Sequence, residues 1–550
     1  MIQHRRIFFL SLLTTSYLII FQVYEACGQR HHDNNLQRQV HAAVHDFSPN
    51  AETLCQLALP DSFHLLSSKQ VQKLADEDYV FSVGDRYTIN NKLRKDGNIQ
   101  SLMDGGKLYS IGFTAPGATF MDISYNRFHM PEGSVAYLSN PHTGKFRGPY
   151  HADSIDDSMG FSTDILDGDS VVLLCYVPSG SLDSVEIELR CIVAGNKGFF
   201  NNETGAACLI NTACDEAKSY RDIIQSVVLI YMDGYLCSGN LINNTAMDGT
   251  PYILTAAHCM EGIYSPHTGS WKFYFNIETY QCDENEGPSL YDLNLQTITG
   301  CKIIAKGQYS DFLLLKLNKE IPASYHAYYC GWDRRNSAPE KGVVGIHHPH
   351  GDYKKFSKSG QKPTTSNCSD IGFDRMAFWN FYWERGICQQ GSSGSGLFNA
   401  ESQRLIGTLT AITDVGCSTN LRSRLNWYGK MSYHWFANNE NSAEAQLRPW
   451  LDPIGSNALY MDGSYQPTTV ISEARTNNKI EVFPNPATET IRIHFSNPIP
   501  HTVRIYSSNG LLIKEIQSYF PTDEISVSSL SKGVYFIETV GAGRTKFVKL

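Results

Sequence analysis

A run of glycines and serines, GSSGSG at residues 391–396, is the first segment that could carry chemistry. Gly/Ser runs usually serve as flexible linkers, and a linker is the simplest interpretation of this run by itself. Its neighbours argue against a linker, because Cys388 precedes it and the apolar Leu397 and Phe398 lead directly into the strand-like segment RLIGTLTAI. A tight turn that presents a nucleophilic serine would continue into a strand in this way.

A nucleophilic serine needs partners, because its hydroxyl is weak at its ordinary pKa and requires a base that is itself oriented by an anion. His258 ends the predicted strand PYILT. Asp311 stands at the mouth of the apolar segment FLLLKL, where a buried carboxylate is costly unless a donor such as an imidazole N–H pairs with it. Each residue alone is usually structural. Together with the serine loop, in the order His, Asp, Ser, they predict acyl transfer by a serine.

A third feature, the HHPH segment with His347, His348 and His350, suggests a metal site. Zinc sites usually combine histidine with cysteine or carboxylate ligands at short, regular spacing, and no such pattern accompanies this segment. We therefore expect no metal and no other cofactor.

The elements that must position these residues belong to a chain of 550 residues, 42% of them hydrophobic, with a formal net charge of −9. This length predicts several domains with buried cores. Because the net charge is negative and no long basic run is present, we expect no nucleic-acid partner.

The N-terminus predicts a secretory signal peptide over residues 1–28. Basic residues at positions 4–6 precede an apolar core over positions 7–21, and small residues follow up to Gly28, where we expect cleavage. An uncleaved anchor is the alternative, although a membrane span needs about 20 apolar residues. No later segment is long and apolar enough to cross a bilayer. We therefore expect an exported protein without a stable membrane span.

Fourteen cysteines in an exported chain predict disulfide bonds. Twelve of them lie between Cys175 and Cys417, so the covalent cross-links are expected in the middle of the chain. Cys55 stands apart near the N-terminus and is left without an assigned partner.

Short strands and turns predict a β-sandwich within an N-terminal domain at residues 29–200. The segment SVEIELRCIV alternates strictly, which places Val185, Ile187, Leu189 and Cys191 on one face. The buried strand SVVLLCYVP precedes it, and a bond between Cys175 and Cys191 could join the two strands.

Strands also dominate residues 205–465, where AEAQLRPWLDP is the best candidate for a helix, ended by Pro453. A polar linker is expected at residues 466–479. Residues 480–550 form a third β unit, in which SSNG is typical of a hairpin turn.

The middle domain resembles the lysyl endopeptidase branch of the trypsin-like serine proteases. The resemblance rests, in chain order, on CSGNLINNTAMDGTPYILTAAHC, SDFLLLKLN, CGWDRRN, GIHHPHG, GSSGSGLFN and WLDPIGSNALYMDG. It implies a mainly β fold, a double β-barrel with an active site in the cleft between the barrels. The N-terminal sandwich and a small C-terminal β-sandwich would flank this protease domain.

The resemblance also implies roles for individual residues. His258 would be the general base, Asp311 its orienter and Ser393 the nucleophile. The backbone N–H groups of Gly391 and Ser393 would form the oxyanion hole. Ser392 and Ser395 would be neighbours without a catalytic role.

Disulfide pairs follow from the same resemblance. It implies the bonds Cys237–Cys259, Cys208–Cys417 and Cys214–Cys282. Four cysteines lack a counterpart in the family, and the simplest pairing for them is Cys301–Cys330 and Cys368–Cys388.

The primary substrate pocket departs from the family. The position of the family's pocket aspartate is Asn426, and Thr410 takes the place of a pocket histidine. A neutral amide cannot offset the desolvation of a lysine ammonium as a carboxylate does. Lysine specificity is therefore doubtful, and Asp414 in an inserted turn is one residue that could replace the missing charge.

The flanking domains carry resemblances of their own. The N-terminal domain resembles the pro-region of the same proteases in SVAYLSNPHTGKFRGPY and GDSVVLL, which implies a zymogen cleaved within residues 194–207; a permanent binding domain is the alternative. The C-terminal unit resembles the type A sorting domain of type IX secretion in VFPNPATETIRI, GVYFIETV and KFVKL.

Taken together, these resemblances predict a serine endopeptidase of protein or peptide substrates, made as a precursor. It would use the type IX secretion machinery of a Bacteroidetes-like bacterium, and it would be secreted or attached to the outer-membrane surface after passage through the periplasm. A catalytically silent adhesin on a protease scaffold is the competing class.

Overall fold

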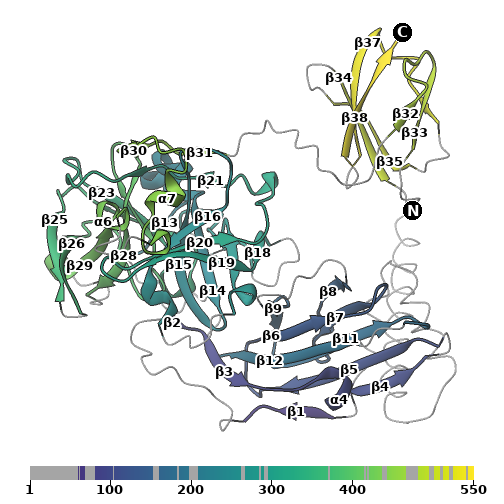
Figure 1. Ribbon diagram of the computed structural model, residues 1–550, viewed down its shortest axis with the longest axis horizontal. Coiled ribbons are helices and arrows are strands. Elements are labelled where there is room, and N and C mark those ends of the chain that lie inside the picture. The colour runs from purple at the N-terminus through teal and green to yellow at the C-terminus, as the bar shows by residue number, and fades with distance from the viewer. Residues whose placement is uncertain are drawn as a thin grey trace, which may run out of the picture. The chain divides into compact units, whose positions relative to one another are not determined.

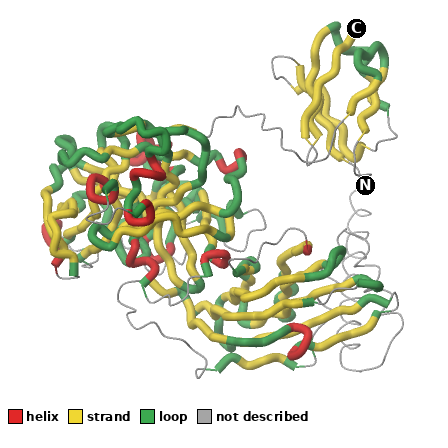
Figure 2. Tube along the Cα trace, in the orientation of Figure 1, coloured by secondary structure: helices red, strands yellow, loops and turns green. Residues whose placement is uncertain are grey.

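The computed structural model is mainly β, as expected (Figures 1 and 2). The described residues up to 465 form one compact unit, and those from 481 onward form a second. The structure describes residues 60, 62–67, 81–102, 105–152, 160–181, 185–196, 208–261, 267–283, 286–289, 295–369, 372–413, 417, 420–436, 442–465, 481–494, 501–507, 512–519, 524–539 and 543–550. The predicted signal peptide, the linker at 466–479, Cys55 and Asp414 lie outside these residues.

The N-terminal domain consists of two sheets that face each other, which confirms the predicted sandwich (Figure 1). Their shared core is built from the inward side chains of both sheets. The first sheet contains β1 (Phe63–Leu65), β4 (Asn98–Ser101), β5 (Lys107–Thr114), β7 (Val135–Ser139), β8 (Phe146–His151) and β11 (Ser170–Val177). The second contains β3 (Gly84–Thr88), β6 (Phe120–His129), β9 (Phe161–Ser162), β10 (Leu166–Asp167) and β12 (Glu186–Gly195).

A β-bulge in β12 changes the face on which Cys191 lies. The register against β6 shifts between Leu189 and Cys191, so the inward series continues with Ile192 instead of Cys191. Such a bulge reverses the alternation of every residue beyond it. The predicted bond Cys175–Cys191 is therefore wrong: Cys175 is buried inside the sandwich, and Cys191 is a thiol on the opposite face of its sheet.

The middle domain contains two curled sheets, consistent with the expected double β-barrel. The first follows the order β18-β17-β14-β15-β16-β20-β19, and β2 of the N-terminal domain pairs with β15. Its strands are β2 (Phe81–Ser82), β14 (Val227–Met232), β15 (Tyr235–Ile242), β16 (Tyr252–Thr255), β17 (Lys272–Phe275), β18 (Thr297–Thr299), β19 (Cys301–Gly307) and β20 (Phe312–Leu317).

The second sheet follows the order β13-β24-β23-β27-β28-β29-β26-β25. Its strands are β13 (Ile210–Asn211), β22 (Trp332–Asp333), β23 (Val343–His347), β24 (Lys355–Ser359), β25 (Thr364–Cys368), β26 (Phe373–Tyr382), β27 (Gly396–Asn399), β28 (Leu405–Ile412), β29 (Leu425–Lys430) and β30 (Tyr460–Met461). A separate pair joins β21 (Tyr328–Tyr329) to β31 (Ser464–Tyr465). One apolar core takes residues from both large sheets and holds them together.

Helices are short throughout the described residues. They include α4 (Leu93–Asp96), α5 (Arg221–Ile224), α6 (Met431–His434) and α7 (Arg448–Leu451). The helix predicted for AEAQLRPWLDP is divided into a 3₁₀ turn at Ala443–Ala445 and α7. Pro449 explains the division, because proline can begin a helix but has no N–H to continue one.

Three disulfide bonds join the pairs implied by the resemblance: Cys208–Cys417, Cys214–Cys282 and Cys237–Cys259. The two other suggested pairs are corrected by the structure. Cys301 and Cys330 are buried thiols in different apolar cores. Cys388 is a buried thiol that is not bonded to Cys368. Its sulfur accepts a hydrogen bond from the Trp383 indole at 3.2 Å.

The C-terminal unit is a small two-sheet structure around its own apolar core. One sheet holds β32 (Glu481–Phe483), β33 (Thr490–His494) and β36 (Ile525–Ser526); the other holds β34 (His501–Ser507), β35 (Leu512–Tyr519), β37 (Gly533–Thr539) and β38 (Gly543–Lys549). Strands β34 and β35 pair antiparallel, as the SSNG turn predicts.

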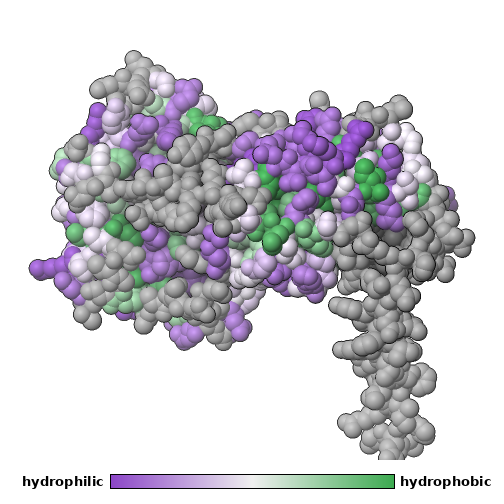
Figure 3. Space-filling model, turned by 90° about the horizontal axis from the view of Figure 1, so that it is seen from below, coloured by the Kyte–Doolittle hydropathy of each residue, from purple (hydrophilic) through white to green (hydrophobic). Residues whose placement is uncertain are grey.

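Among the residues coloured in Figure 3, hydrophilic areas are interspersed with smaller hydrophobic ones. Among the described residues, no helix has the length and apolar character required to cross a membrane.

Candidate functional site

His258 and Asp311 lie at the adjacent ends of two paired strands. Strand β16 pairs antiparallel with β20, so the chain leaves β16 into the short turn of His258 where Asp311 enters β20. Asp311 Oδ2 lies 2.7 Å from His258 Nδ1, and Asp311 Oδ1 accepts a bond of 2.8 Å from the backbone N–H of His258. A carboxylate only accepts, so Nδ1 carries the proton and Nε2 remains available as an acceptor.

The electrostatics of this pair favour a more basic imidazole. His258 is 5% exposed and Asp311 1%. Burial lowers the pKa of His258, but the charge and the hydrogen bond of Asp311 outweigh it and leave that pKa above its ordinary value. Asp311 has a φ of 60°, a left-handed conformation that is uncommon for a residue other than glycine.

The serine loop of residues 391–396 is a tight turn, since Gly391 and Gly394 have φ values of 86° and 77°. Ser392 and Ser395 are fully buried within it, whereas Ser393 is partly exposed. Of the loop's three serines, Ser393 is therefore the one that a substrate could reach.

Backbone donors in this loop alternate between paired and unpaired. The N–H groups of Ser392 and Gly394 donate to the carbonyls of Gln389 and Leu409 at 3.0 and 2.9 Å. Within the part of the chain that the structure describes, those of Gly391 and Ser393 donate to no protein acceptor. Buried N–H groups are nearly always paired, so these two donors are suited to receive an anionic oxygen of a ligand.

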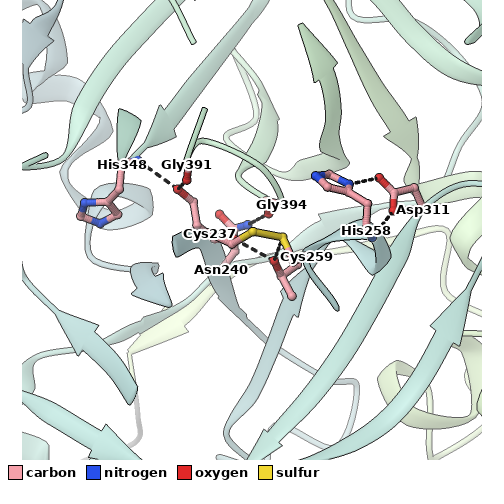
Figure 4. The surroundings of a disulfide bond; sticks show 10 residues. Cys237, Asn240, His258, Cys259, Asp311, His348, Gly391 and Gly394 are labelled. Atoms are coloured by element: carbon pink, nitrogen blue, oxygen red, sulfur yellow. Dashed lines mark hydrogen bonds and ion pairs between the residues drawn. A yellow bond between two sulfur atoms is a disulfide. The ribbon is translucent and has the colours of Figure 1, made fainter. Parts of the chain in front are cut away.

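A disulfide bond, drawn in Figure 4, and hydrogen bonds from β15 connect the histidine to the serine loop. Cys259 follows His258 and bonds to Cys237. The next residue, Ser238, donates its N–H to the carbonyl of Ser393 at 2.8 Å. In Figure 4 the imidazole of His258 lies between Asp311 and the loop that carries Gly394.

Close packing brings the loop against the segment before His258. A Cβ on Gly394 would lie 2.0 Å from Thr255 Oγ1 and 2.7 Å from Ala256 N, so no larger residue fits there. The Ser393 hydroxyl itself makes no hydrogen bond to another described residue, His258 included. Catalytic hydrogen bonds are often long in a free enzyme and tighten when substrate binds.

Ser238 is a site residue that the sequence does not single out. Its hydroxyl donates to the carbonyl of Gly391 at 2.9 Å and accepts from the backbone N–H of His348 at 2.9 Å. Asn240, two residues further along β15, donates to the carbonyl of Gly394 at 3.2 Å. Their polar side chains in an otherwise apolar buried strand, YLCSGNLI, are the signal that could have revealed them.

The predicted pocket residues lie in neighbouring strands, Thr410 in β28 and Asn426 in β29. Asn426 is 2% exposed, and its amide donates to the carbonyl of Arg424 at 2.7 Å. Thr410 is 6% exposed, and among the described residues its hydroxyl has no hydrogen-bond partner. Neither residue supplies a negative charge.

The HHPH segment contributes to the site through hydrogen bonds. His347 Nδ1 lies 2.9 Å from the hydroxyl of Ser392, and His348 Nδ1 lies 2.9 Å from the carbonyl of Asp352. No group of three or more potential metal ligands is found among the residues that the structure describes.

The N-terminal domain reaches the edge of this site. Strand β2 pairs antiparallel with the start of β15, directly before Cys237. The ring of Phe81 stacks on that of His350 with centroids 4.8 Å apart, and the backbone N–H of His350 donates to the carbonyl of Gln390.

Buried ion pairs accompany this contact. Arg190 donates to Asp233 at 2.8 Å, and Lys272 donates to Asp122 at 2.8 Å. All four side chains are less than a tenth exposed. Each pair joins the sandwich to the first barrel, because Arg190 and Asp122 belong to the former and Asp233 and Lys272 to the latter.

Comparisons with known proteins find relatives of two parts of this chain. Residues 202–429 match the family described as "Lysyl endopeptidase, C-terminal domain", and residues 481–550 match "Secretion system C-terminal sorting domain". Lysyl endopeptidase of Pseudomonas aeruginosa is 29% identical over 225 residues, which are 40% of this chain and 42% of that protein. The match thus spans less than half of that relative's length.

Solved structures give weaker likenesses. Two crystal structures of the Rv3671c protease in an inactive form, one of them from M. tuberculosis H37Rv, match with TM-scores of 0.25 and 0.26 at 13% identity. They cover 38% of this chain and 82% and 84% of theirs. The family matches confirm both resemblances. The C-terminal unit matches a secretion sorting domain, which indicates export to the medium or the cell surface in a Bacteroidetes-like bacterium.

Proposed function

We propose that this chain, whose middle part is lysyl endopeptidase-like and whose tail is a secretion sorting domain, is a secreted serine endopeptidase. Its catalytic residues are His258, Asp311 and Ser393. The observation that carries the proposal is the pair of hydrogen bonds by which Asp311 binds both the backbone N–H and the ring of His258. This pair lies beside a loop with an accessible serine and two unpaired N–H groups.

Each group then has one task in the reaction. Nε2 of His258 takes the proton from the Ser393 hydroxyl as the oxygen attacks the substrate carbonyl. The N–H groups of Gly391 and Ser393 stabilise the oxyanion of the tetrahedral intermediate, a contribution of about 2.7–4 kcal/mol per donor in comparable sites. His258 returns its proton to the leaving amine, and water then hydrolyses the acyl-enzyme by the same route.

Peptide hydrolysis by single-serine variants tests this proposal. Ser393→Ala should lose turnover, whereas Ser395→Ala should keep it, because Ser395 is buried and has no role in the mechanism. Hydrolysis that survives Ser393→Ala would refute the assignment. A native protein that folds, binds a peptide and never cleaves it would favour the competing class, a silent adhesin.

Specificity is proposed to differ from that of a lysyl endopeptidase. Asn426 and Thr410 offer no charge to a lysine ammonium, and the Asn426 amide is already engaged with its own backbone. We therefore expect no strong preference for lysine before the cleaved bond. Sequencing the cut sites in a digested peptide library measures the preference directly.

The N-terminal domain is proposed to be a pro-region, which would make the chain a zymogen. Its contact with β15 lies next to Cys237, and the Phe81–His350 stack lies next to the loop that precedes Ser393. A domain placed there can cover one end of the site until cleavage, for which residues 194–207 are the expected segment. A permanent binding domain would remain attached in the active protein.

A further inference from the structure

Two buried histidines outside the proposed triad share one geometry. His434 Nδ1 lies 2.8 Å from Ser310 Oγ, and its Nε2 lies 3.0 Å from Thr408 Oγ1. His347 Nδ1 lies 2.9 Å from Ser392 Oγ, and its Nε2 lies 3.0 Å from Ser357 Oγ. In each case one of the bridged hydroxyls belongs to the residue directly before a catalytic one.

Neither histidine is accessible, so neither can contact substrate. Both are fully buried. Burial lowers the pKa of each to about 3, which keeps both imidazoles neutral. A neutral imidazole has one donor and one acceptor, and a hydroxyl can act as either, so each bridge satisfies all its polar atoms.

The first bridge holds the turn that contains Asp311. Gly429 packs tightly against both ends of this contact, since a Cβ on it would lie 2.0 Å from the Ser310 carbonyl oxygen and 2.7 Å from His434 Cε1. The residue after Ser310 is the left-handed Asp311. The other end of the bridge is Thr408 in β28. Its neighbour Leu409 exchanges two backbone hydrogen bonds with the serine loop, each 2.9 Å long.

The second bridge, in which His347 joins the hydroxyls of Ser392 and Ser357, fixes the serine loop to the second sheet. The hydroxyl of Ser392 contacts His347 and also accepts a bond of 3.2 Å from the backbone N–H of Gln389. His347 ends β23, and Ser357 lies in the paired strand β24, so the loop is fixed to the body of the second sheet.

We propose that His434 and His347 are positioning residues that fix Asp311 and Ser393 through the hydroxyls of Ser310 and Ser392. The inference rests on the proposed function, because it assigns a task to groups behind that triad. A displacement of about 1 Å in such a site can lower turnover about 100-fold, which sets the expected size of the effect.

The test is steady-state kinetics on the active enzyme obtained from the full chain. His434→Leu and His347→Leu should each lower kcat about 100-fold, with KM within about twofold, because the substrate contacts remain. His434→Gln and His347→Gln should recover much of the loss, since an amide can both donate and accept. Ser226→Ala is the matched control: it removes a buried hydroxyl bond of 2.7 Å in the same domain and should leave kcat unchanged.

Combined variants distinguish positioning from general destabilisation. In an Asp311→Asn background, His434→Leu should lower kcat no further, and Ser392→Ala should reproduce the loss of His347→Leu without adding to it. Losses that multiply in either pair would overturn the proposal, as would equal losses in Ser226→Ala. If the leucine variants do not fold, Ser310→Ala and Ser392→Ala carry the same test.

Failure of the proposed function looks different. Activity that survives Ser393→Ala would refute the triad, and the positioning role of the two histidines would be refuted with it. Loss of activity in Ser393→Ala, together with full kcat in both leucine variants, would overturn the positioning role alone.

Discussion

At the scale of single residues, Asp311 is the group on which the proposed chemistry depends. It binds both the backbone and the ring of His258, so it sets the position of the imidazole and its tautomer together. Its left-handed backbone conformation is unfavourable, and packing against neighbouring residues must stabilise it. Strain of this kind commonly gathers at active sites.

Asp311→Asn should lower kcat about 10⁴-fold, because an amide can hold the imidazole in the wrong tautomer. The pH profile should also move. Asp311 raises the pKa of His258, and the base acts only when neutral, so activity rises as pH increases through that pKa. Without the negative charge the acidic limb should shift to lower pH.

Measurement of kcat/KM against pH checks the direction of this shift. Glu261→Gln provides the control, because Glu261 raises the same pKa more weakly from an exposed position and should shift the limb far less. An acidic limb that stays in place in Asp311→Asn would contradict the role given to the pair.

Asn426→Asp should increase cleavage after lysine. A carboxylate in place of the amide would offset the desolvation of the lysine ammonium. A tenfold increase in kcat/KM requires only about 1.4 kcal/mol of additional transition-state stabilisation. Lysyl and alanyl peptides of otherwise identical sequence measure the change. An unchanged ratio between them would place Asn426 outside the pocket.

The sequence predicts some residues of the site better than others. His258 and Asp311 could be paired in advance because each breaks an apolar strand pattern at its end. His434 could not, since a histidine in SYHWF carries no spacing that points to Ser310 or Thr408. The three disulfides implied by the resemblance are present in the structure. The pairs Cys301–Cys330 and Cys368–Cys388, chosen because these cysteines were left over, are not.

At the scale of elements, the disulfide Cys237–Cys259 fastens β15 to the turn after β16. One end adjoins His258, and the other adjoins Ser238, which binds the carbonyl of Ser393. The disulfide therefore connects His258 to Ser238 by a short covalent path, and the hydrogen bond from Ser238 to Ser393 completes the link to the serine loop.

Replacing Cys237 and Cys259 together by serine should destabilise the fold by about 3 kcal/mol and also lower kcat. Replacing Cys214 and Cys282 should destabilise it by a similar amount with kcat retained, because neither cysteine adjoins a proposed catalytic residue or Ser238 in the chain. Denaturant unfolding and kinetics on both double variants make the comparison. Equal effects on kcat would remove any special role for the first bond.

Strand β12 shows where sequence patterns stop being sufficient. Alternation correctly placed Val185, Ile187 and Leu189 in the sandwich core, but the bulge beyond Leu189 moved Cys191 to the other face. No residue type in ELRCIV marks that bulge. Its effect is to bury Arg190, which hydrogen-bonds to Asp233 of the barrel.

At the scale of the whole molecule, the N-terminal domain is held to the first barrel by buried charges as well as apolar side chains. Burial raises the pKa of Asp233, but the charges of Arg190 and Arg86 outweigh burial and lower that pKa. The contact is therefore fully formed at pH values above the ordinary pKa of a carboxyl group, and it weakens as the pH falls through the lowered pKa. Removing one partner of a buried pair leaves the other uncompensated.

Asp233→Asn should therefore release the N-terminal domain once the connecting segment is cut. The variant is made in a Ser393→Ala chain, to prevent self-cleavage, and an added protease cuts within residues 197–207. Size-exclusion chromatography should show the two domains together in the parent and apart in Asp233→Asn. Glu401→Gln, which removes an exposed ion pair with Lys341, should behave as the parent.

The most direct measurement of the central claim is the site of labelling by a fluorophosphonate. Such a probe bonds to a serine only where a base activates the hydroxyl and donors receive the phosphoryl oxygen. Peptide mapping of the labelled enzyme by mass spectrometry should find the adduct on Ser393 and nowhere else, and Asp311→Asn should slow its formation. A protein that stays unlabelled, or an adduct on Ser392 or Ser395, would contradict the account.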